Sequence, residues 1–360
     1  GAWHARRFLV QYLPRIFLTM LHRAAMLVLQ QARGSGLPKW PRNTPGARSV
    51  TGSANEGSLA SLACLKDSRS VVRIKGKDTF TFLQGLVSND VIQFAQNPGP
   101  GILYSLMLNN HGRFMFDIFL HRHQADSHNS LTVDVDKDHM AKFLRVLQIY
   151  KLRAEVDILN ISDTHRVWVR MGSKEPVKTG PWFPDPRLPQ LGSRAVLPAD
   201  FLPPDRAATA PDEFRSLRFD LGVPEGCSEI PTGEALPLEY NLDELNGVSY
   251  HKGCYVGQEL TARTHYTGVI RKRLMPVKLH GTSPRPAVGE PITAARAKRA
   301  AGKLVAVDGS RGLALLRLDS AATAMAGGTP LHCQGCTVTP FTPAWWPLGW
   351  MAAAATEGSP

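Results

Sequence analysis

Acidic residues are missing from the first 55 positions of the chain, and the first carboxylate is Glu56. Eight of the 42 Lys and Arg residues lie in that segment, which leaves 34 basic against 30 acidic residues in the remainder. That mild excess argues against a general nucleic-acid-binding surface on the body of the protein. Long apolar runs are also missing, because Arg15, His22 and Arg23 interrupt them well short of the ~18 residues of a membrane-spanning helix.

An Arg-rich, acid-free and partly apolar leader is typical of a mitochondrial presequence. From Met20 onward, apolar and basic residues alternate as they do in an amphipathic targeting helix, so Met20 is the expected start. We therefore expect residues 1–60 to form a presequence and linker, and we expect the protein to reside in the mitochondrial matrix.

Several sequence signatures of catalysis are absent. There is no P-loop, no GxGxxG followed by an acidic residue, no HExxH and no GxSxG, which disfavours nucleotide binding and the common hydrolase chemistries. The five cysteines are an odd, sparse set that does not suit a disulfide framework. Cys333 and Cys336 form a CxxC without a second pair of zinc ligands nearby, which favours a structural role for both. A structural role is also favoured for the histidines of one hairpin region, His121, His123 and His128.

The hydrophobic pattern predicts an α+β body followed by a small closed β domain. The expected elements are a strand at 71–74, a helix over 77–91 with Asp78 as N-cap, a hairpin over 101–122 with its turn at 109–112, a helix over 137–152, a helix from about 212 to 222, and β strands within 275–281, 302–309, 312–319 and 331–341.

The stretch HKGCYVGQELTAR at 251–263 places a single cysteine, Cys254, beside a lysine and between two glycines. A thiol reacts or binds metal as the thiolate, which a nearby cation or exposed N–H groups favour. Lys252 can supply the cation, and Gly253 and Gly257 allow a turn that projects the sulfur outward. A small cysteine buried in a loop fits the same residues, and the residues alone leave both interpretations open.

Two further features of the sequence each allow two interpretations. The basic stretch RTHYTGVIRKR at 263–273 suits either an anion-binding site or a solvated strand edge, and the strand edge is favoured. Asp117 follows an apolar run inside an expected strand. Its carboxylate could face a central cavity as an acid or base, or it could equally lie on the surface.

Four stretches together resemble the YgfZ branch of the folate-binding superfamily that includes the glycine-cleavage T-protein. They are FLQGLVSNDV, MLNNHGRFMFDIFL, LPLEYNLDELNGVSYHKGCYVGQELTAR and GVIRKRL. The resemblance covers roughly residues 62–340, and its most specific motif is K-G-C-aromatic-x-G-Q-E at Lys252–Glu259. Together with the leader, these stretches make the chain similar to matrix iron–sulfur assembly factors of that branch.

The resemblance implies a cloverleaf-like α+β fold around a central cavity. An α+β body of two related parts would occupy 61–272, a C-terminal Greek-key β-barrel 273–345, and a flexible tail 346–360. Relatives hold a tetrahydrofolate in the cavity. The expected folate contacts, carried over from the resemblance, are Asp117, Asn109, Tyr255, Gln258 and Arg263.

The resemblance also implies a role in the late maturation of 4Fe–4S proteins, with aconitase-type and lipoate-synthase-type clients and A-type assembly partners of the ISCA family. The functional cysteine of the motif falls on Cys254, with Lys252 favouring its thiolate. One cysteine cannot supply the roughly four protein ligands of a cluster, so we expect a 2Fe–2S cluster shared with the partner.

The alternative function is a folate-dependent one-carbon transferase of the aminomethyltransferase kind. Two departures from the T-protein count against it and favour an accessory factor that is not an enzyme. The T-protein has consecutive aspartates where this chain has Phe116 before Asp117, and it lacks the cysteine at the position of Cys254.

Overall fold

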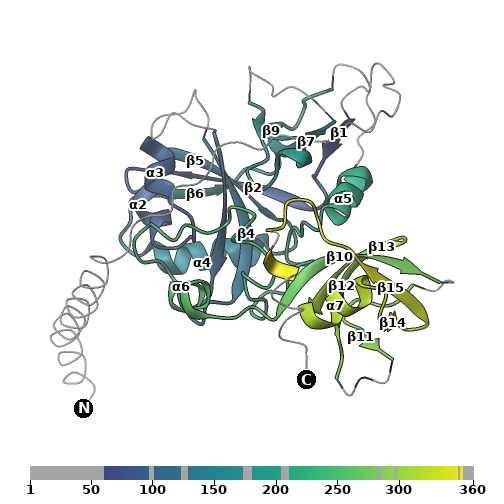
Figure 1. Ribbon diagram of the computed structural model, residues 1–360. Helices are drawn as coiled ribbons and strands as arrows, with labels where there is room; N and C mark the ends of the chain where they lie inside the picture. The colour runs from purple at the N-terminus through teal and green to yellow at the C-terminus, as the bar shows by residue number, and fades with distance from the viewer. Residues whose placement is uncertain are drawn as a thin grey trace, which may run out of the picture. The chain divides into compact units, whose positions relative to one another are not determined.

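The computed structural model describes residues 61–96, 101–122, 129–172, 181–203, 211–281, 285–295, 297, 299–347 and 349–351. The predicted presequence, with Met20, and also His123 and His128 lie outside these residues. Within the described ranges the chain forms two β-sheets with flanking helices and a closed β-barrel (Figure 1). No helix in these ranges has both the length and the apolar character needed to span a bilayer.

The first sheet has five strands in the order β3-β4-β5-β2-β6. Their bounds are β2 Arg69–Lys75, β3 Ile102–Leu108, β4 Phe114–His121, β5 Ser130–Asp136 and β6 Asp157–Asn160. Strands β3 and β4 pair antiparallel, which confirms the hairpin predicted over 101–122. The strand predicted at 71–74 is likewise confirmed as part of β2.

The helix predicted over 77–91 is wrong as a single element. Helix α2 (Thr79–Gln84) ends before Gly85, and a second helix, α3, starts only at Val91 and runs to Gln96. The side chain of Gln84 explains part of the break, because its oxygen accepts the N–H groups of Val91 at 2.8 Å and Ile92 at 3.3 Å at the start of α3. Asp78 occupies the N-cap position without capping, and its carboxylate instead accepts the N–H of Glu155.

The second sheet has four strands in the order β1-β7-β9-β8. Its strands are β1 Ser61–Cys64, β7 His165–Met171, β8 Phe183–Pro184 and β9 Ser193–Pro198, and the short 3-10 helix η1 spans Pro189–Leu191. Two predicted helices are confirmed close to their expected bounds, α4 at Met140–Lys151 and α5 at Pro211–Asp220. Proline suits the first position of α5, where its missing N–H has no helical partner to lose.

The barrel closes in the order β10-β13-β12-β11-β14-β15 and confirms the predicted β domain. Its elements are β10 Lys272–His280, β11 Pro291–Ala294, β12 Gly302–Asp308, β13 Arg311–Arg317, α7 Leu318–Met325, β14 Leu331–Cys333 and β15 Cys336–Pro340. Cys333 and Cys336 are paired residues of the β14–β15 hairpin, and both are buried. No disulfide joins any of the five cysteines, all of which lie in the described part of the chain.

Two barrel strands, β10 and β13, connect the barrel to the α+β body, because their side chains alternate between the two cores. In β10, Leu274 packs into the core of the body, whereas its neighbour Met275 packs inside the barrel. In β13, Leu315 likewise packs into the core of the body, and Leu316 packs inside the barrel. Because successive side chains of a strand point to opposite faces, each of these strands contributes to both cores at once. Helix α5 adds contacts from the body to β12 and β13.

Candidate functional site

Cys254 lies on the exposed part of the loop that leads into helix α6 (Gln258–Thr267). Its neighbours alternate in burial, since Gly253 is exposed while Lys252 and Tyr255 retain only 7% and 8% of their accessible surface. The interpretation of Cys254 as a small buried cysteine is therefore wrong. The loop is anchored on both sides of a sulfur that remains open to solvent.

The anchor on the N-terminal side is the ammonium group of Lys252. Its Nζ donates to the carbonyl oxygens of Gln84 at 2.7 Å, Val87 at 2.6 Å and Asn89 at 2.9 Å. Burial lowers the pKa of Lys252 to about 8, with Asp90 acting in the opposite direction. An ammonium has three protons, and all three are used here, so Lys252 cannot also hydrogen-bond the thiolate of Cys254. Lys252 therefore holds the loop in place, and a charge effect of Lys252 that favours the Cys254 thiolate stays a prediction.

Tyr255 forms the anchor on the other side. Its ring centroid lies 5.0 Å from Nζ of Lys252, a cation–π distance, and its backbone N–H donates to Oε1 of Gln258 at 3.3 Å. Burial raises the pKa of the Tyr255 hydroxyl to about 12. Gln258, which was expected to contact folate, thus uses its side-chain oxygen inside the motif at the start of α6.

The motif loop packs directly on the turn of the β3–β4 hairpin. Gly257 has φ +81°, and a Cβ on it would lie 2.4 Å from the carbonyl oxygen of Asn109. On the facing side Gly112 has φ +71°, and its Cβ would lie 2.7 Å from that of Leu260. The side-chain oxygen of Asn109 accepts the N–H groups of His111 and Arg113, so it shapes the turn itself. The two segments approach this closely because both positions lack a side chain.

This contact predicts unequal effects of two substitutions in one motif. Gly257→Ala should lower the free energy of unfolding by about 2 kcal/mol or more, because it adds a backbone clash to an unfavourable positive φ. Gly253→Ala, where a Cβ would meet nothing within 4 Å, should be nearly neutral. Urea denaturation of both variants measures the difference, and equal stability of the two would contradict this account of the loop.

The basic stretch 263–273 is not a strand edge over most of its length. Residues up to Thr267 belong to α6, and only the last two residues belong to β10. The ring of His265 stacks on Tyr250 with centroids 3.6 Å apart and an interplanar angle of 17°. Arg263 is exposed on the same helix.

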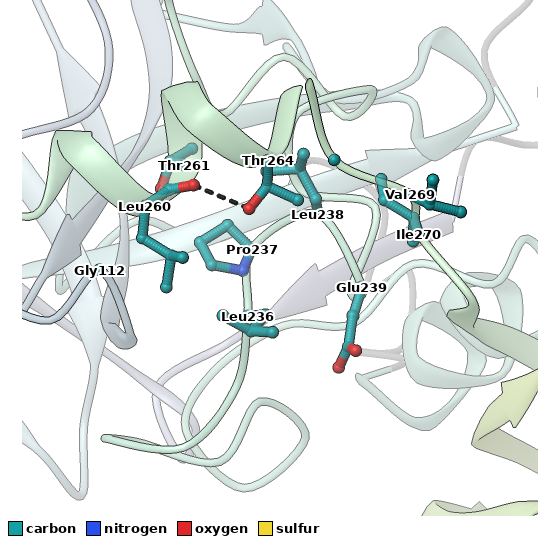
Figure 2. A pocket seen from close by; sticks show the side chains of 11 residues that line it. Gly112, Leu236, Pro237, Leu238, Glu239, Leu260, Thr261, Thr264, Val269 and Ile270 are labelled. Carbon is teal, nitrogen blue, oxygen red and sulfur yellow. Dashed lines mark hydrogen bonds between the residues drawn. The ribbon is translucent and has the colours of Figure 1, made fainter. Parts of the chain in front are cut away.

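A pocket of about 270 Å³ lies between α6 and the segment 236–239, next to the hairpin turn (Figure 2). Its lining is mostly apolar. Thr264 offers little to a ligand, because its hydroxyl donates to the carbonyl oxygen of Leu260 at 2.8 Å. Glu239 is the acidic residue of the lining, and burial raises the pKa of its carboxyl group.

Asp117 is completely buried, so its placement on the surface is wrong. One carboxylate oxygen pairs with Arg69 at 3.0 Å, and the other accepts the N–H of Gly226 at 3.1 Å. Burial raises the pKa of Asp117, although Arg69 opposes the shift. Both oxygens are thus engaged by the protein at a position without solvent exposure.

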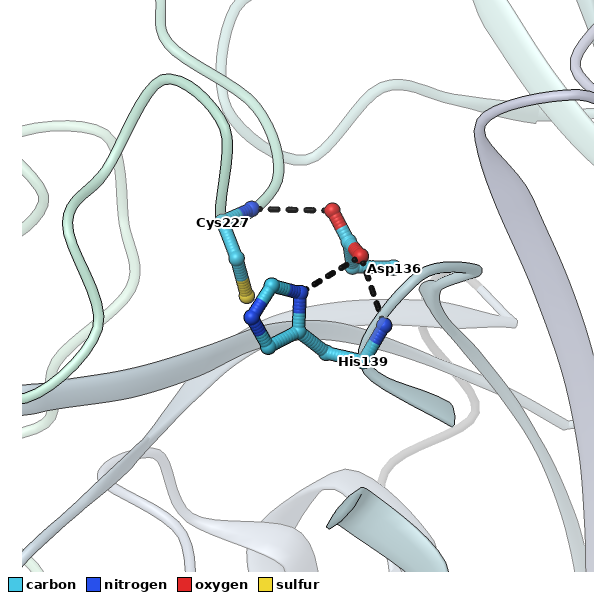
Figure 3. A group of neighbouring side chains, drawn as sticks. All are labelled: Asp136, His139 and Cys227. Atoms are coloured by element: carbon cyan, nitrogen blue, oxygen red, sulfur yellow. Dashed lines mark hydrogen bonds and ion pairs between the residues drawn. The ribbon is translucent and has the colours of Figure 1, made fainter. Parts of the chain in front are cut away.

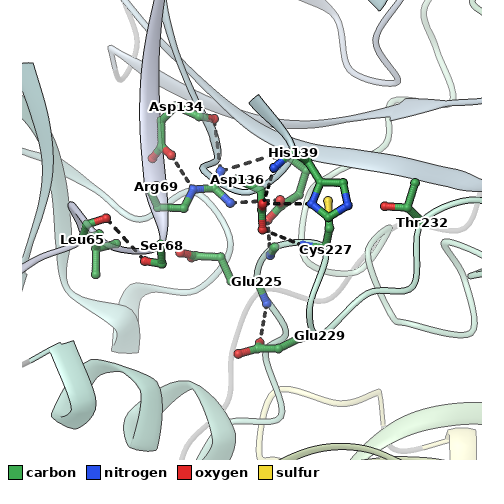
Figure 4. A network of polar contacts seen from close by, with 12 residues as sticks. Leu65, Ser68, Arg69, Asp134, Asp136, His139, Glu225, Cys227, Glu229 and Thr232 are labelled. Carbon is green, nitrogen blue, oxygen red and sulfur yellow. Dashed lines mark hydrogen bonds and ion pairs between the residues drawn. The ribbon is translucent and has the colours of Figure 1, made fainter. Parts of the chain in front are cut away.

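Asp117 is part of a buried ion-pair network between the two sheets, part of which is drawn in Figure 4. Arg194 of β9 bonds Asp134 of β5 at 2.7 Å and Glu225 at 3.0 Å, and its guanidinium lies 3.9 Å from the ring centroid of Phe119. Burial works against ionisation of Asp134, but Arg194 and Arg69 hold its pKa below the usual value. Glu225 also keeps a lowered pKa despite burial, because Arg194 and Arg187 face it.

Sequence reasoning missed this network. The available signal was the alternation in the strand TVDVD. Side chains two positions apart lie on the same face of a strand, so Asp134 and Asp136 share one face and Val133 and Val135 the other. Two carboxylates on one face of an otherwise apolar strand call for buried cations. Which arginines supply that charge could not be read from neighbouring residues, since Arg194 lies 60 positions from Asp134.

The five predicted folate contacts do not form one cradle. Asp117 lies in the ion-pair network, Asn109 shapes the hairpin turn, and Arg263 is exposed on α6. Tyr255 and Gln258 contact each other within the motif loop. These residues as placed do not fit a common tetrahydrofolate site, and no chemical step is derived through one.

Comparison with known proteins gives consistent matches. Residues 271–348 match a family described as "CAF17, C-terminal beta-barrel domain". The solved structure of glycine cleavage system aminomethyltransferase T from Bartonella henselae shares the fold, with a TM-score of 0.59 and 13% identity over 80% of this chain and 86% of that one. This likeness confirms the predicted fold class, the GcvT/YgfZ fold with a C-terminal barrel.

The similar curated proteins are named as mitochondrial assembly factors. The mouse "Iron-sulfur cluster assembly factor IBA57, mitochondrial" is 36% identical over 308 residues, covering 78% of this chain and 84% of the mouse protein. The human protein of the same name is 32% identical over 358 residues, covering 90% and 98%. These names confirm the predicted mitochondrial location, and this chain therefore belongs to the IBA57 family of mitochondrial iron–sulfur cluster assembly factors.

Proposed function

We propose that this protein acts late in the maturation of 4Fe–4S proteins in the mitochondrial matrix, by contributing Cys254 to a 2Fe–2S cluster shared with an A-type protein of the ISCA family. The exposure of Cys254 on an anchored loop carries the proposal. Thiolate sulfur is the common protein ligand of such clusters. Because a cluster needs about four ligands, the partner would supply the others.

The anchoring of the loop supports this role. A donated ligand must reach a cluster held by another protein, so it has to be accessible and yet fixed in position. Lys252 and Tyr255 are buried on either side of Cys254, which limits the freedom of the loop without covering the sulfur. The clients in this proposal are aconitase-type and lipoate-synthase-type apoproteins, which would receive their cluster after the shared complex has formed.

Folate-dependent one-carbon transfer receives no support from the site geometry. The likeness to the aminomethyltransferase extends to the fold alone at 13% identity. Phe116 precedes Asp117 where the T-protein has a second acid, and both oxygens of Asp117 are engaged. Tetrahydrofolate binding remains a prediction from the resemblance, and an accessory role without turnover is the proposed one.

Anaerobic reconstitution tests the proposal. The full chain is mixed with an A-type partner, iron and sulfide, and the visible absorbance of the cluster is recorded after the complex is isolated. Cys254→Ser should reduce that absorbance to the level of the partner alone, because the bridging ligand is lost. The melting temperature should not change, since the side chain is exposed.

Cys64→Ser is the matched control. Cys64 is buried in β1 and is not part of the motif, so the shared cluster should persist in this variant. A cluster of undiminished absorbance in the Cys254→Ser complex would refute the proposal. Loss of the cluster from both variants would also refute it, because the effect would not be specific to the motif.

A further inference from the structure

Three side chains of metal-binding type meet at a place outside the motif loop (Figure 3). Asp136 ends strand β5, His139 is the N-cap residue of α4, and Cys227 lies in the chain after α5. A carboxylate oxygen, a ring nitrogen and the sulfur lie within 4.8 Å of one another. The three residues lie up to 91 positions apart in the sequence, so their meeting is a product of the fold.

Asp136 holds the other two residues in place. One of its oxygens accepts the backbone N–H of His139 at 3.0 Å and pairs with the ring Nδ1 at 3.1 Å. The second oxygen accepts the backbone N–H of Cys227 at 2.9 Å. A carboxylate accepts hydrogen bonds, so Nδ1 carries a proton in this pair, and in the neutral ring Nε2 then has the lone pair that can bind a metal. Among the described residues, none hydrogen-bonds that nitrogen.

The glycine before Cys227 allows the backbone to approach the carboxylate of Asp136 closely. Gly226 has φ +79°, and a Cβ there would lie 2.6 Å from the second oxygen of Asp136. The N–H of Gly226 donates to Asp117, so the ion-pair network fixes the loop next to the cysteine. The backbone N–H groups of Gly226 and Cys227 are therefore both fixed by carboxylates, which places the sulfur within 4.8 Å of a ring nitrogen of His139.

The three residues differ in exposure. Asp136 and Cys227 keep 7% and 8% of their accessible surface, whereas the His139 side chain is 32% exposed. Sγ of Cys227 lies 3.5 Å from the carbonyl oxygen of Met115, which accepts the thiol proton. The Thr232 hydroxyl donates to the same carbonyl at 3.1 Å. His139 is therefore the most exposed of the three residues, and the sulfur is largely shielded from solvent.

We propose that Cys227 and His139 bind a divalent transition-metal ion of the Zn²⁺ or Fe²⁺ class, with Asp136 as the residue that positions both ligands. Burial raises the pKa of the Cys227 thiol to about 12, so the thiol would release its proton to solvent when the ion binds. The resulting thiolate and the imidazole together select such ions over Mg²⁺ and Ca²⁺, which prefer oxygen ligands. A carboxylate that holds the far nitrogen of a ligating histidine is a common feature of metal sites. Two protein ligands leave coordination positions for water, so the ion would be exchangeable. The site is separate from Cys254 and does not depend on the function proposed above.

Cobalt binding tests the site in the full chain. The Cys254→Ser protein, which lacks the exposed thiol, is titrated with Co²⁺ under anaerobic conditions. We expect a near-ultraviolet charge-transfer band from thiolate to cobalt that saturates at one ion per chain and is displaced by Zn²⁺. The band should disappear when Cys227→Ser is added and persist when Cys336→Ser is added instead.

Substitutions of the other two residues of the cluster keep the test decisive if Cys227→Ser fails to fold. His139→Asn alters a partly exposed side chain and should retain the fold while binding cobalt at least tenfold more weakly. Asp136→Asn should weaken binding by about ten- to a hundredfold without removing the band. The proposal is overturned if the parent shows no band, if His139→Asn binds as tightly as the parent, or if the band survives Cys227→Ser.

Discussion

Arg194→Leu should lower the free energy of unfolding by about 4 kcal/mol, within the range of roughly 3–5 kcal/mol for breaking a buried ion pair from one side. Arg194 is fully buried and bonds both Asp134 and Glu225. Leucine removes the guanidinium that lies over the ring of Phe119 and leaves two carboxylates with less compensating charge in an interior of low polarity. Chemical denaturation with urea measures the loss.

An exposed arginine provides the matched control. Arg311 pairs with Asp220 at 2.8 Å, but the two side chains are 43% and 46% exposed. Arg311→Leu should therefore cost less than about 1 kcal/mol, as solvent-exposed ion pairs do. If both leucine variants lost the same stability, the buried network could not be the reason for the large effect at Arg194.

Lys252→Met should cost about 3 kcal/mol, because it removes three hydrogen bonds from a charged donor and leaves their carbonyl acceptors without a partner. The acceptors lie in the segment 84–89, so this segment should lose local stability together with the motif loop. Hydrogen exchange should accelerate in both segments. Because Cys254 stays accessible, any loss of cluster sharing would come from a looser loop and not from a missing ligand.

Lys77→Met is the control for Lys252. Lys77 pairs with Glu155 at the surface, where the two side chains are 62% and 65% exposed. This variant should denature at nearly the same urea concentration as the parent. A Lys252→Met protein with unchanged stability and unchanged exchange in 84–89 would show that the Lys252 hydrogen bonds contribute little in solution.

Much of the fold followed from local patterns. The β3–β4 hairpin was predictable because two apolar strands flank a turn whose first residue, Asn109, bonds the backbone within four positions. Helix α4 was predictable because Met140, Phe143 and Leu147 recur at helical spacing on one face. The barrel strands were likewise marked by short apolar runs between turn residues.

The helix expected over 77–91 shows where local patterns mislead. Phe80, Leu83 and Leu86 have helical spacing, yet the helix ends at Gln84. The carbonyl oxygens of Gln84 at that end, and of Val87 and Asn89 beyond it, accept from Lys252, which lies 168 positions from Gln84. Tertiary hydrogen bonds of this kind replace those that a longer helix would have made, and they leave no trace in the segment itself.

The sequence by itself determined the family, through the motif at Lys252–Glu259 and the stretches around it, and it determined the elements with strong periodicity. The tertiary structure alone decided that Cys254 is exposed and that Lys252 holds the loop through hydrogen bonds to backbone carbonyls. It also decided that Asp117 is buried in an ion pair with Arg69, and that Cys227 meets His139. The physical reason is common to all: burial and hydrogen-bond partners depend on residues far away in the chain, and periodicity reports only on near neighbours.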